Sequence, residues 1–198
     1  MLQTQGNGTY WFSDEMYRLL EHNSPPLPAV AASYERGVTL SGMSKTYSMP
    51  GLRIGWLATT DRVVMNRLNE LKDYTTICPS APSEILALIG LRNGDEIVSR
   101  NQALMRDGLV AARSFCERHD DIFVWANPKG GSICFPRLRG GVSSTEVCAS
   151  LAKEGIMLVH SELFEDAGNE RVRFGVARAD FPQNLALLEP HLVRFKTN

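Results

Sequence analysis

The segment from Thr39 to Ala58 constrains this chain more than any other. It carries Lys45 in a short turn that is rich in hydroxyl groups and glycine and lies between two apolar runs. No charged residue other than Lys45 lies between Arg36 and Arg53, so the sequence predicts that Lys45 is not an ordinary surface lysine. Such surroundings favour loss of the ammonium proton, which makes the amine a nucleophile able to form a Schiff base with an aldehyde.

Arg53 stands on the far side of the same turn. It follows the Pro50-Gly51 corner, where the second apolar run begins. A guanidinium is always charged and presents a planar fork of N–H donors, which suits a phosphate. The segment therefore predicts an amine nucleophile and an anion-binding group at one site.

The motif S-K-T-Y-S-M-P-G-L-R-I-G-W, residues 44–56, resembles the lysine segment of the class I and II aminotransferases, enzymes of fold type I that use pyridoxal 5′-phosphate (PLP). The resemblance implies that Lys45 holds the cofactor as a Schiff base and that Arg53 binds its phosphate. Much of the family has a serine ligand for the phosphate three residues before the lysine. Here that position is Gly42, with Ser41 and Ser44 on either side, and of these two Ser44 is our candidate for the hydroxyl contact.

Asp14 and Tyr17 follow a strand predicted at Thr9–Phe12. At the carboxyl edge of an open α/β sheet both side chains can point into a ligand-binding crevice. The alternative is that Asp14 caps a turn and Tyr17 packs. The spacing D-E-x-Y is similar to a second hallmark of the same family. It implies that Asp14 keeps the pyridine nitrogen protonated and that Tyr17 hydrogen-bonds the phenolic oxygen, with Lys45 as the third catalytic residue.

Arg173 lies in an otherwise apolar run at Arg171–Ala177. Burying a guanidinium without a partner is costly, so Arg173 either pairs with a protein carboxylate or binds a substrate carboxylate in bidentate geometry. Residues 163–177 are similar to the closing motif of the family. The resemblance implies that Arg173, rather than Arg171 or Arg178, binds the α-carboxylate of the substrate.

Apolar periodicity and turn residues predict the secondary structure. The expected strands are Thr9–Phe12, which we expect to be buried, Gly37–Ser41, Ile54–Ala58, Ile122–Ala126 and Gly131–Pro136 joined as a hairpin, Gly155–His160 and Arg171–Ala177. A short helical turn is expected at Arg18–Glu21, and the expected helices are Asp61–Lys72, Pro82–His119 with a break near Asn93-Gly94, Thr145–Lys153 and Gln183–Phe195.

The resemblance implies an α/β chain with a partial PLP-transferase fold of type I. We expect residues 1–82 to be a remnant of the PLP-binding large domain, 83–120 a connecting long helix, and 121–198 a small C-terminal α+β domain. The enzymes that the chain resembles are about twice as long, and their lysine lies past the middle of the chain. We therefore expect these 198 residues to be the C-terminal half of such an enzyme.

Composition excludes several other classes. A net charge of −1 gives no electrostatic reason to expect nucleic acid or an anionic membrane as partner. No apolar segment is long enough to span a bilayer and the first eight residues lack a secretory pattern, so we expect a cytoplasmic protein. We expect no metal site: the histidines His119 and His160 are assigned to surface or core roles, and reduced structural cysteines are expected at Cys78, Cys116, Cys134 and Cys148.

The resemblance implies transamination between an amino acid and a 2-oxo acid, with Lys45 as general base and acid and a homodimer in the full-length form. The same machinery serves lyases and decarboxylases of this fold, so the reaction type stays open. A non-catalytic fragment that keeps the fold and weak PLP binding is a second hypothesis. A plain α/β binding module without cofactor is a third.

Overall fold

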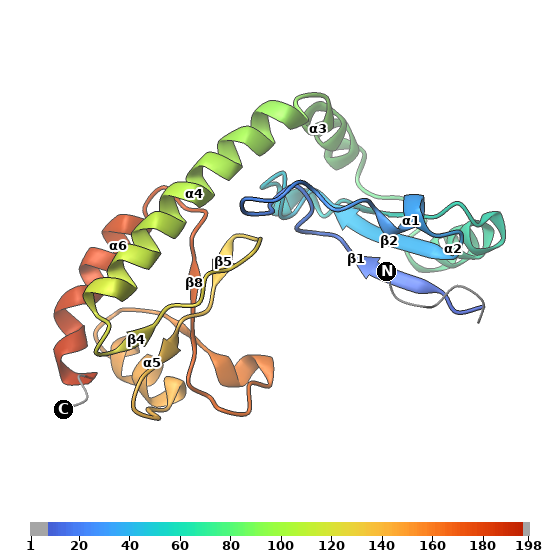
Figure 1. Cartoon of the computed structure of the whole chain (residues 1–198). Coiled ribbons are helices and arrows are strands. Elements are labelled where there is room, and N and C mark those ends of the chain that lie inside the picture. Colours follow the sequence, from blue (N-terminus) through green and yellow to red (C-terminus); the bar gives the residue numbers. More distant parts are fainter. Residues whose placement is uncertain (1–7, 196–198) are drawn as a thin grey trace. The chain divides into compact units, whose positions relative to one another are not determined.

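The computed structural model describes residues 8–195 and divides the chain into two compact units. One unit ends at Asn101 and the other begins at Gln102, so the boundary falls inside helix α4 (Gly94–Arg118) (Figure 1). The outer ends of the predicted first and last domains lie outside the described residues. So do seven of the eight N-terminal residues on which the secretion argument rests.

The first unit is built on a three-stranded sheet in the order β1-β2-β3 (Figure 1). Strand β1 (Trp11–Asp14) runs parallel to β2 (Gly37–Gly42), and the connection between them contains the short helix α1 (Val30–Ser33). Strand β3 (Gly55–Ala58) pairs antiparallel with β2 after the 3₁₀ turn η1 (Pro50–Leu52), which contains the Pro50-Gly51 corner.

The prediction of a buried strand at Thr9–Phe12 is wrong both in the bounds of the strand and in its burial. Strand β1 begins at Trp11, and the side chains of Trp11 and Phe12 are 41% and 58% exposed. The reason is that β1 pairs only with β2 among the described strands, so it forms an edge of the sheet. The turn that follows it, residues 16–19, does not become the predicted helical turn.

Three helices follow the sheet in the sequence. Helix α2 (Arg62–Thr75) is capped by Asp61, whose carboxylate accepts from the backbone amides of Val63 and Val64. Helix α3 (Ala81–Arg92) ends at Asn93, and α4 begins at Gly94, which confirms the predicted break. Within the first unit α3 packs through Ala87 and Gly90, and a β-carbon at Gly90 would lie 3.0 Å from the methyl group of the fully buried Met43.

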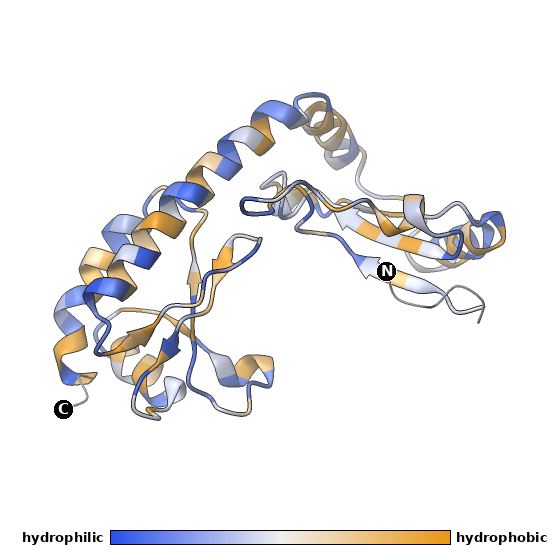
Figure 2. Cartoon of the chain, in the orientation of Figure 1, coloured by the Kyte–Doolittle hydropathy of each residue, from blue (hydrophilic) through white to orange (hydrophobic). Residues whose placement is uncertain are grey.

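The outer surface of α3 is apolar. Five large apolar side chains of this helix are 43% to 60% exposed in the described structure, namely Ile85, Leu86, Leu88, Ile89 and Leu91. Figure 2 shows apolar residues along α3. A helix that is apolar on all sides is normally buried, so this helix is suited to a partner surface.

The second unit combines short strands with the larger part of α4 and with further helices. Strand β4 (Phe123–Val124) pairs with β6 (Arg137–Leu138), and β8 (Val172–Gly175) lies between β5 (Ile133–Cys134) and β7 (Val159–His160), all antiparallel. The predicted hairpin between the first two strands is therefore wrong, because β4 pairs with β6 and β5 pairs with β8. Helix α5 (Ser144–Ala152) is capped by Ser143, whose side chain accepts from the backbone amide of Glu146.

The chain closes with α6 (Phe181–Leu188) and a 3₁₀ helix, η3 (Glu189–Phe195), in place of the single predicted helix. Pro190 explains the change, because proline has no N–H to donate to the preceding turn.

Aromatic rings fill the core of the second unit. The rings of Phe115, Phe123 and Phe174 are in mutual contact with centroids 5.9 to 6.4 Å apart, and Phe181 adjoins Phe174 at 6.0 Å. Three cysteines, Cys116, Cys134 and Cys148, are free and buried. Burial raises the pKa of Cys116 and Cys134 to about 12 and that of Cys148 to about 11. These thiols stay protonated and pack as small apolar groups, whereas Cys78 is free and exposed, which corrects its assignment to the interior.

Residues 8–195 contain no helix whose length and apolar character together would allow it to cross a bilayer.

Candidate functional site

Lys45 lies in the turn that leaves the end of β2. The turn is closed by two backbone hydrogen bonds, from Met49 N to Met43 O at 2.9 Å and from Ser48 N to Lys45 O at 3.1 Å. Met43 is directed into the core, and Lys45 is exposed. The prediction that Lys45 is not a surface residue is wrong in this respect, because the apolar neighbours turn inward without it. In the described part of the chain no carboxylate lies within ion-pair distance of Lys45, so its amine is accessible.

Thr46 fixes this turn against the Asp14–Tyr17 segment. Its hydroxyl is 2.7 Å from the carbonyl oxygen of Arg18 and 3.2 Å from that of Met16. Its own carbonyl accepts a hydrogen bond of 2.9 Å from the side chain of Asn101 in α4. Both side chains are buried. The two loops that carry the predicted residues are thereby fixed to each other.

Tyr17 and Lys45 meet as a result. The Lys45 amine is 5.8 Å from the centroid of the Tyr17 ring. A protonated amine over an aromatic face is attracted by the quadrupole of the ring. The described structure therefore brings together two of the three predicted catalytic residues, although they are far apart in the sequence.

Thr46→Val tests this link. The variant leaves the carbonyl groups of Met16 and Arg18 without their hydroxyl donor, so we expect the free energy of unfolding to fall by about 1–3 kcal/mol. Urea denaturation measures the change. Thr46→Ser keeps the hydroxyl and is the matched control, which should lose less than half as much. Equal losses in the two variants would show that the methyl group of Thr46, and not its hydrogen bonds, stabilises the turn.

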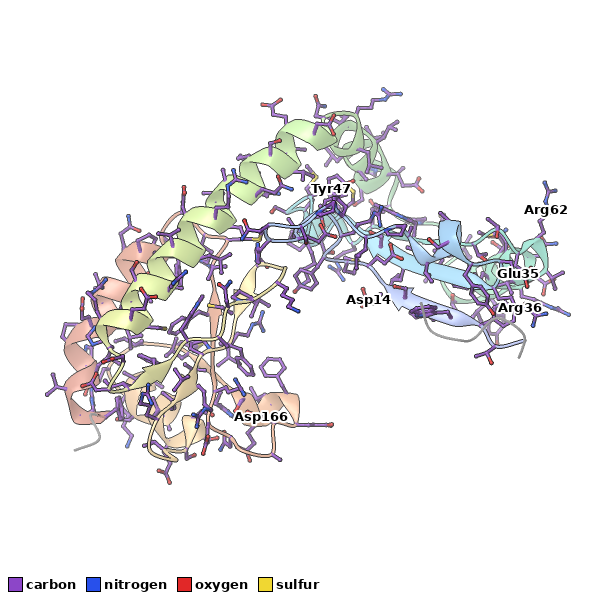
Figure 3. The ribbon with its side chains drawn as sticks, viewed as in Figure 1. Asp14, Glu35, Arg36, Tyr47, Arg62 and Asp166 are labelled. Carbon is purple, nitrogen blue, oxygen red and sulfur yellow. The ribbon has the colours of Figure 1, made fainter. Side chains whose placement is uncertain are left out.

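Asp14 lies at the end of β1 (Figure 3). One of its carboxylate oxygens, Oδ1, accepts a hydrogen bond of 3.0 Å from the backbone amide of Met16, which is the capping role considered as the alternative. Tyr17 does not pack as that alternative supposed, because it is 37% exposed. Asp14 is exposed, and among the described contacts it makes no ion pair with Lys45 or Arg53. The structure therefore does not join Asp14 to the Tyr17–Lys45 pair by a direct bond.

The two predicted phosphate ligands are on the same turn. Ser44 is half-buried, and no described protein group hydrogen-bonds its hydroxyl. Arg53 is exposed, with φ at +54°, and its guanidinium donates to the carbonyl of Pro50 at 2.7 Å. This conformation directs the guanidinium back toward its own turn, and the remaining donors are open to solvent.

Glu15 is a structural residue that the sequence did not reveal. Its Oε1 atom accepts from the backbone amide of Val30 at 2.8 Å and from the Thr39 hydroxyl at 2.9 Å. The other oxygen is 3.5 Å from Arg18, which also donates to the carbonyl of Leu27. Glu15 thus joins β2 to the start of α1 and supports the strand that leads to Lys45.

The first unit also has an open cavity of about 450 Å³. Thr39 and Ser41 of β2 line it, together with Trp56 of β3 and with Thr46 and Tyr47 of the lysine turn. Asp14, Tyr17, Lys45 and Arg53 do not line it. The cavity therefore adjoins the lysine turn but is not lined by the predicted catalytic groups. The candidate site is defined by the side chains of the lysine turn and of Tyr17, and not by this cavity.

Arg173 belongs to the second unit, where it is half-buried on β8 opposite Val159 of β7. Its neighbours in sequence are paired with carboxylates: Arg171 Nε is 3.8 Å from Asp166 Oδ2, and Arg178 bonds both oxygens of Asp180 at 2.8 and 2.9 Å. No described carboxylate pairs with Arg173, so the protein-carboxylate alternative does not hold within residues 8–195. Its guanidinium lies instead over the ring of Phe164, 5.7 Å from the centroid.

His119 and His160 both have partners within the protein. His119 Nε2 is 2.8 Å from a carboxylate oxygen of Glu189, and His160 Nδ1 is 3.2 Å from the hydroxyl of Thr145. Within the described residues there is no group of three or more His, Cys, Asp or Glu side chains that could hold a metal ion.

Comparison with known proteins gives a consistent result. The family model described as "Aminotransferase class I and II" matches residues 2–189. Capreomycidine synthase of Streptomyces vinaceus is 26% identical over 180 residues, which cover 90% of this chain and 46% of that protein. Aromatic-amino-acid aminotransferase 2 of Thermococcus litoralis is 30% identical over 174 residues, or 84% of this chain and 44% of that protein.

Solved structures agree. The crystal structure of a PLP-dependent aminotransferase from Streptococcus suis superposes with a TM-score of 0.87 at 29% identity, and the match covers 96% of this chain and 50% of that one. The chain therefore spans about half the length of the relatives that it matches.

Proposed function

The chain belongs to the family of class I and II aminotransferases, and we propose that it provides the lysine-bearing part of a PLP-dependent enzyme that transfers an amino group between an amino acid and a 2-oxo acid. We propose further that the complete enzyme is a homodimer and that residues 1–82, 83–120 and 121–198 are its large-domain remnant, connecting helix and small domain.

One observation carries the proposal. An accessible lysine amine without a carboxylate partner among the described residues lies 5.8 Å from the centre of a tyrosine ring, at the end of a central strand. An amine is the group that binds an aldehyde covalently, and a phenol can donate to a ring oxygen. The Ser44 hydroxyl and the open donors of Arg53 suit a phosphate, and Asp14 keeps one carboxylate oxygen free of described partners. The donor set therefore fits PLP.

When bound, PLP supplies an electron-withdrawing ring that stabilises negative charge on the α-carbon of an amino acid. Lys45 would hold the cofactor covalently and, once free, would move a proton at the substrate α-carbon as general base and acid. Asp14 would accept a hydrogen bond from the ring nitrogen and keep it protonated, while Tyr17 would donate to the ring oxygen. Arg53 and Ser44 would bind the phosphate.

The proposed role of Arg173 predicts a selective loss. A planar guanidinium fork matches a carboxylate in two hydrogen bonds, which a lysine cannot reproduce. In the form of the enzyme that shows turnover, we expect Arg173→Lys to lower kcat/KM for α-amino acids by about ten- to a hundredfold. A primary amine without a carboxyl group serves as control substrate and should be affected much less. Equal losses for both substrates would show that Arg173 is structural.

A PLP titration of the chain, followed by assays with amino acid and 2-oxo acid pairs, tests the proposal. We expect a visible absorbance band when the chain binds PLP, and amino-group transfer as the reaction in the form of the enzyme that shows turnover. Binding without turnover would favour the non-catalytic fragment, and no binding would contradict the proposal. Loss of carbon dioxide or another group from the amino acid, without formation of a new amino acid, would favour a lyase or decarboxylase.

A further inference from the structure

We propose that Phe164 is a positioning residue for Arg173, whose aromatic ring holds the guanidinium with its charge unpaired so that a substrate carboxylate can bind it. The inference rests on the role proposed for Arg173, and it identifies what keeps that arginine available. It follows from four features of the second unit: the contact between guanidinium and ring, the support of the ring, the polar network that holds the helix carrying Phe164, and the pairing of the neighbouring arginines.

The first feature is the contact itself. The central carbon of the Arg173 guanidinium is 5.7 Å from the centroid of the Phe164 ring, within the range of a cation–π interaction. Such an interaction fixes the direction of the guanidinium without neutralising it. A carboxylate at the same place would take the N–H donors that a ligand needs.

The second feature is the support of the Phe164 ring. Phe135, which follows β5, meets Phe164 edge to face, with centroids 5.7 Å apart and an interplanar angle of 88°. This geometry is one of the preferred arrangements of aromatic pairs. Phe164 itself is 50% exposed, so one part of the ring packs and another part faces solvent beside the arginine.

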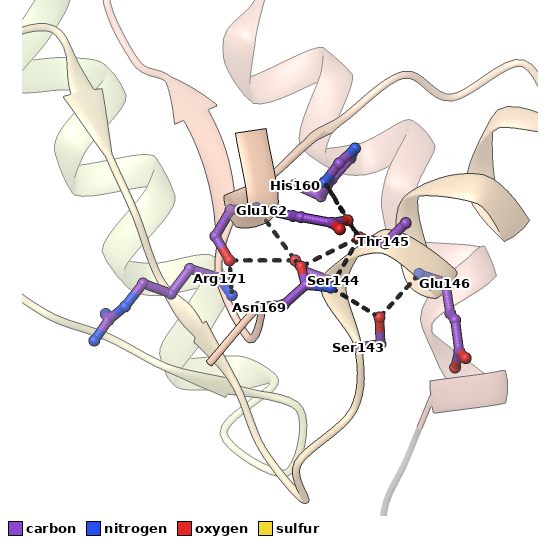
Figure 4. A network of polar contacts seen from close by, with 9 residues as sticks. Ser143, Ser144, Thr145, Glu146, His160, Glu162, Asn169 and Arg171 are labelled. Carbon is purple, nitrogen blue, oxygen red and sulfur yellow. Dashed lines mark hydrogen bonds and ion pairs between the residues drawn. The ribbon is translucent and has the colours of Figure 1, made fainter. Parts of the chain in front are cut away.

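The third feature is a polar network that holds the helix carrying Phe164. This 3₁₀ helix, η2 (Ser161–Phe164), begins at a fully buried serine. Figure 4 shows the network around Ser144, Asn169 and Arg171. The backbone amide of Ser161 donates to the Arg171 carbonyl at 3.0 Å and to the Ser144 hydroxyl at 3.2 Å, and the Ser161 hydroxyl accepts from the Arg171 amide at 3.2 Å. Because Arg171 directly precedes β8, which carries Arg173, the network fixes η2 against the strand that carries the arginine.

The fourth feature is the difference between Arg173 and the arginines near it, which pair with carboxylates. Arg171 is in ion-pair range of Asp166, and Arg137 lies 3.2 Å from Glu170, whereas Arg173 has the Phe164 ring in the described structure. Asp166 and Glu170 are thus close to Arg173 in the sequence, but they pair with Arg171 and Arg137. The geometry assigns to Phe164 the place that a carboxylate occupies beside Arg171 and Arg137.

A spectroscopic measurement tests the positioning directly. Protons above an aromatic ring are shifted upfield, so the Nε–Hε signal of Arg173, identified by its loss in Arg173→Lys, should be displaced in the wild-type protein. We expect the displacement to disappear in Phe164→Leu and to persist in Phe164→Tyr. Leu163→Ala, which changes an exposed neighbour on the same helix, should leave the signal unchanged.

Carboxylate binding provides a second test of the positioning role. We expect titration with 3-phenylpropanoate to move the Arg173 signal and the dissociation constant to rise about tenfold in Phe164→Leu but less than twofold in Phe164→Tyr and Leu163→Ala. The neutral analogue 3-phenylpropanamide should not move the signal in any variant.

The outcomes separate this inference from the proposed function. An Arg173 signal that is the same in Phe164→Leu and wild type would overturn the positioning role, as would an unchanged dissociation constant in a variant whose signal has moved. If the signal depends on Phe164 but no variant binds the carboxylate, the positioning contact stands and the substrate role of Arg173 fails.

Discussion

Replacing Lys45 by alanine is expected to abolish both the visible absorbance band on PLP addition and all transamination. The reason is that the described turn presents the Lys45 amine, and no other amine, over the ring of Tyr17. A hydroxyl or backbone group cannot replace an amine in covalent binding of an aldehyde or in the later proton transfer. We expect turnover to fall below detection and PLP to bind, if at all, without the band.

The matched control is Lys129→Ala. Lys129 is exposed in the loop between β4 and β5 of the second unit and has no described ion pair. This variant should keep the absorbance band and the PLP affinity of the wild type. A Lys45→Ala protein that still develops the full band would contradict the assignment of the cofactor to this turn.

The second large effect concerns the apolar surface of the first unit. We expect the 198-residue chain to self-associate and to be marginally stable, because five large side chains of α3 and the aromatic residues of β1 are exposed. Fully burying one such side chain contributes about 1.5–3 kcal/mol, so exposure of several forfeits an amount comparable with the stability of a domain. An unpaired strand edge also recruits other chains.

Size-exclusion chromatography with light scattering measures the association. The double variant Ile85→Glu/Ile89→Lys places an ion pair at i and i+4 on α3 and should shift the chain to monomer. Leu187→Glu alters a 65% exposed residue of α6 and should leave the association unchanged, since isolated surface apolar residues are normal. A compact wild-type monomer, with strong hydrogen-exchange protection of residues 9–12 and measurable turnover, would show that the chain is a complete minimal enzyme.

Sequence reasoning located most helices well and strand pairing less well. Helices α2 and α5 are close to their predicted limits because their caps, Asp61 and Ser143, act locally through amides two or three residues away. The residues Asn127–Gly130 have turn propensity, yet no hairpin forms. Strand pairing depends on which distant strand competes for an edge, and here β8 pairs with β5.

In the candidate site, too, some features could be predicted from the local sequence and others could not. Lys45 and Tyr17 could be selected from their motifs, and the structure places them together. The exposure of Lys45 could not be predicted, because the charges of neighbouring residues do not determine which side chains of a turn face the core. Asn101 has no local signal, since its hydrogen bond to Thr46 joins residues 55 positions apart.

Reduction with borohydride after PLP addition, followed by peptide mapping, tests the central claim most directly. Reduction fixes the cofactor to the amine that holds it and does not depend on turnover. We predict one labelled peptide, with the label on Lys45 at a stoichiometry near one per chain. A label spread over Lys72, Lys129 and Lys153, with none on Lys45, would contradict the account.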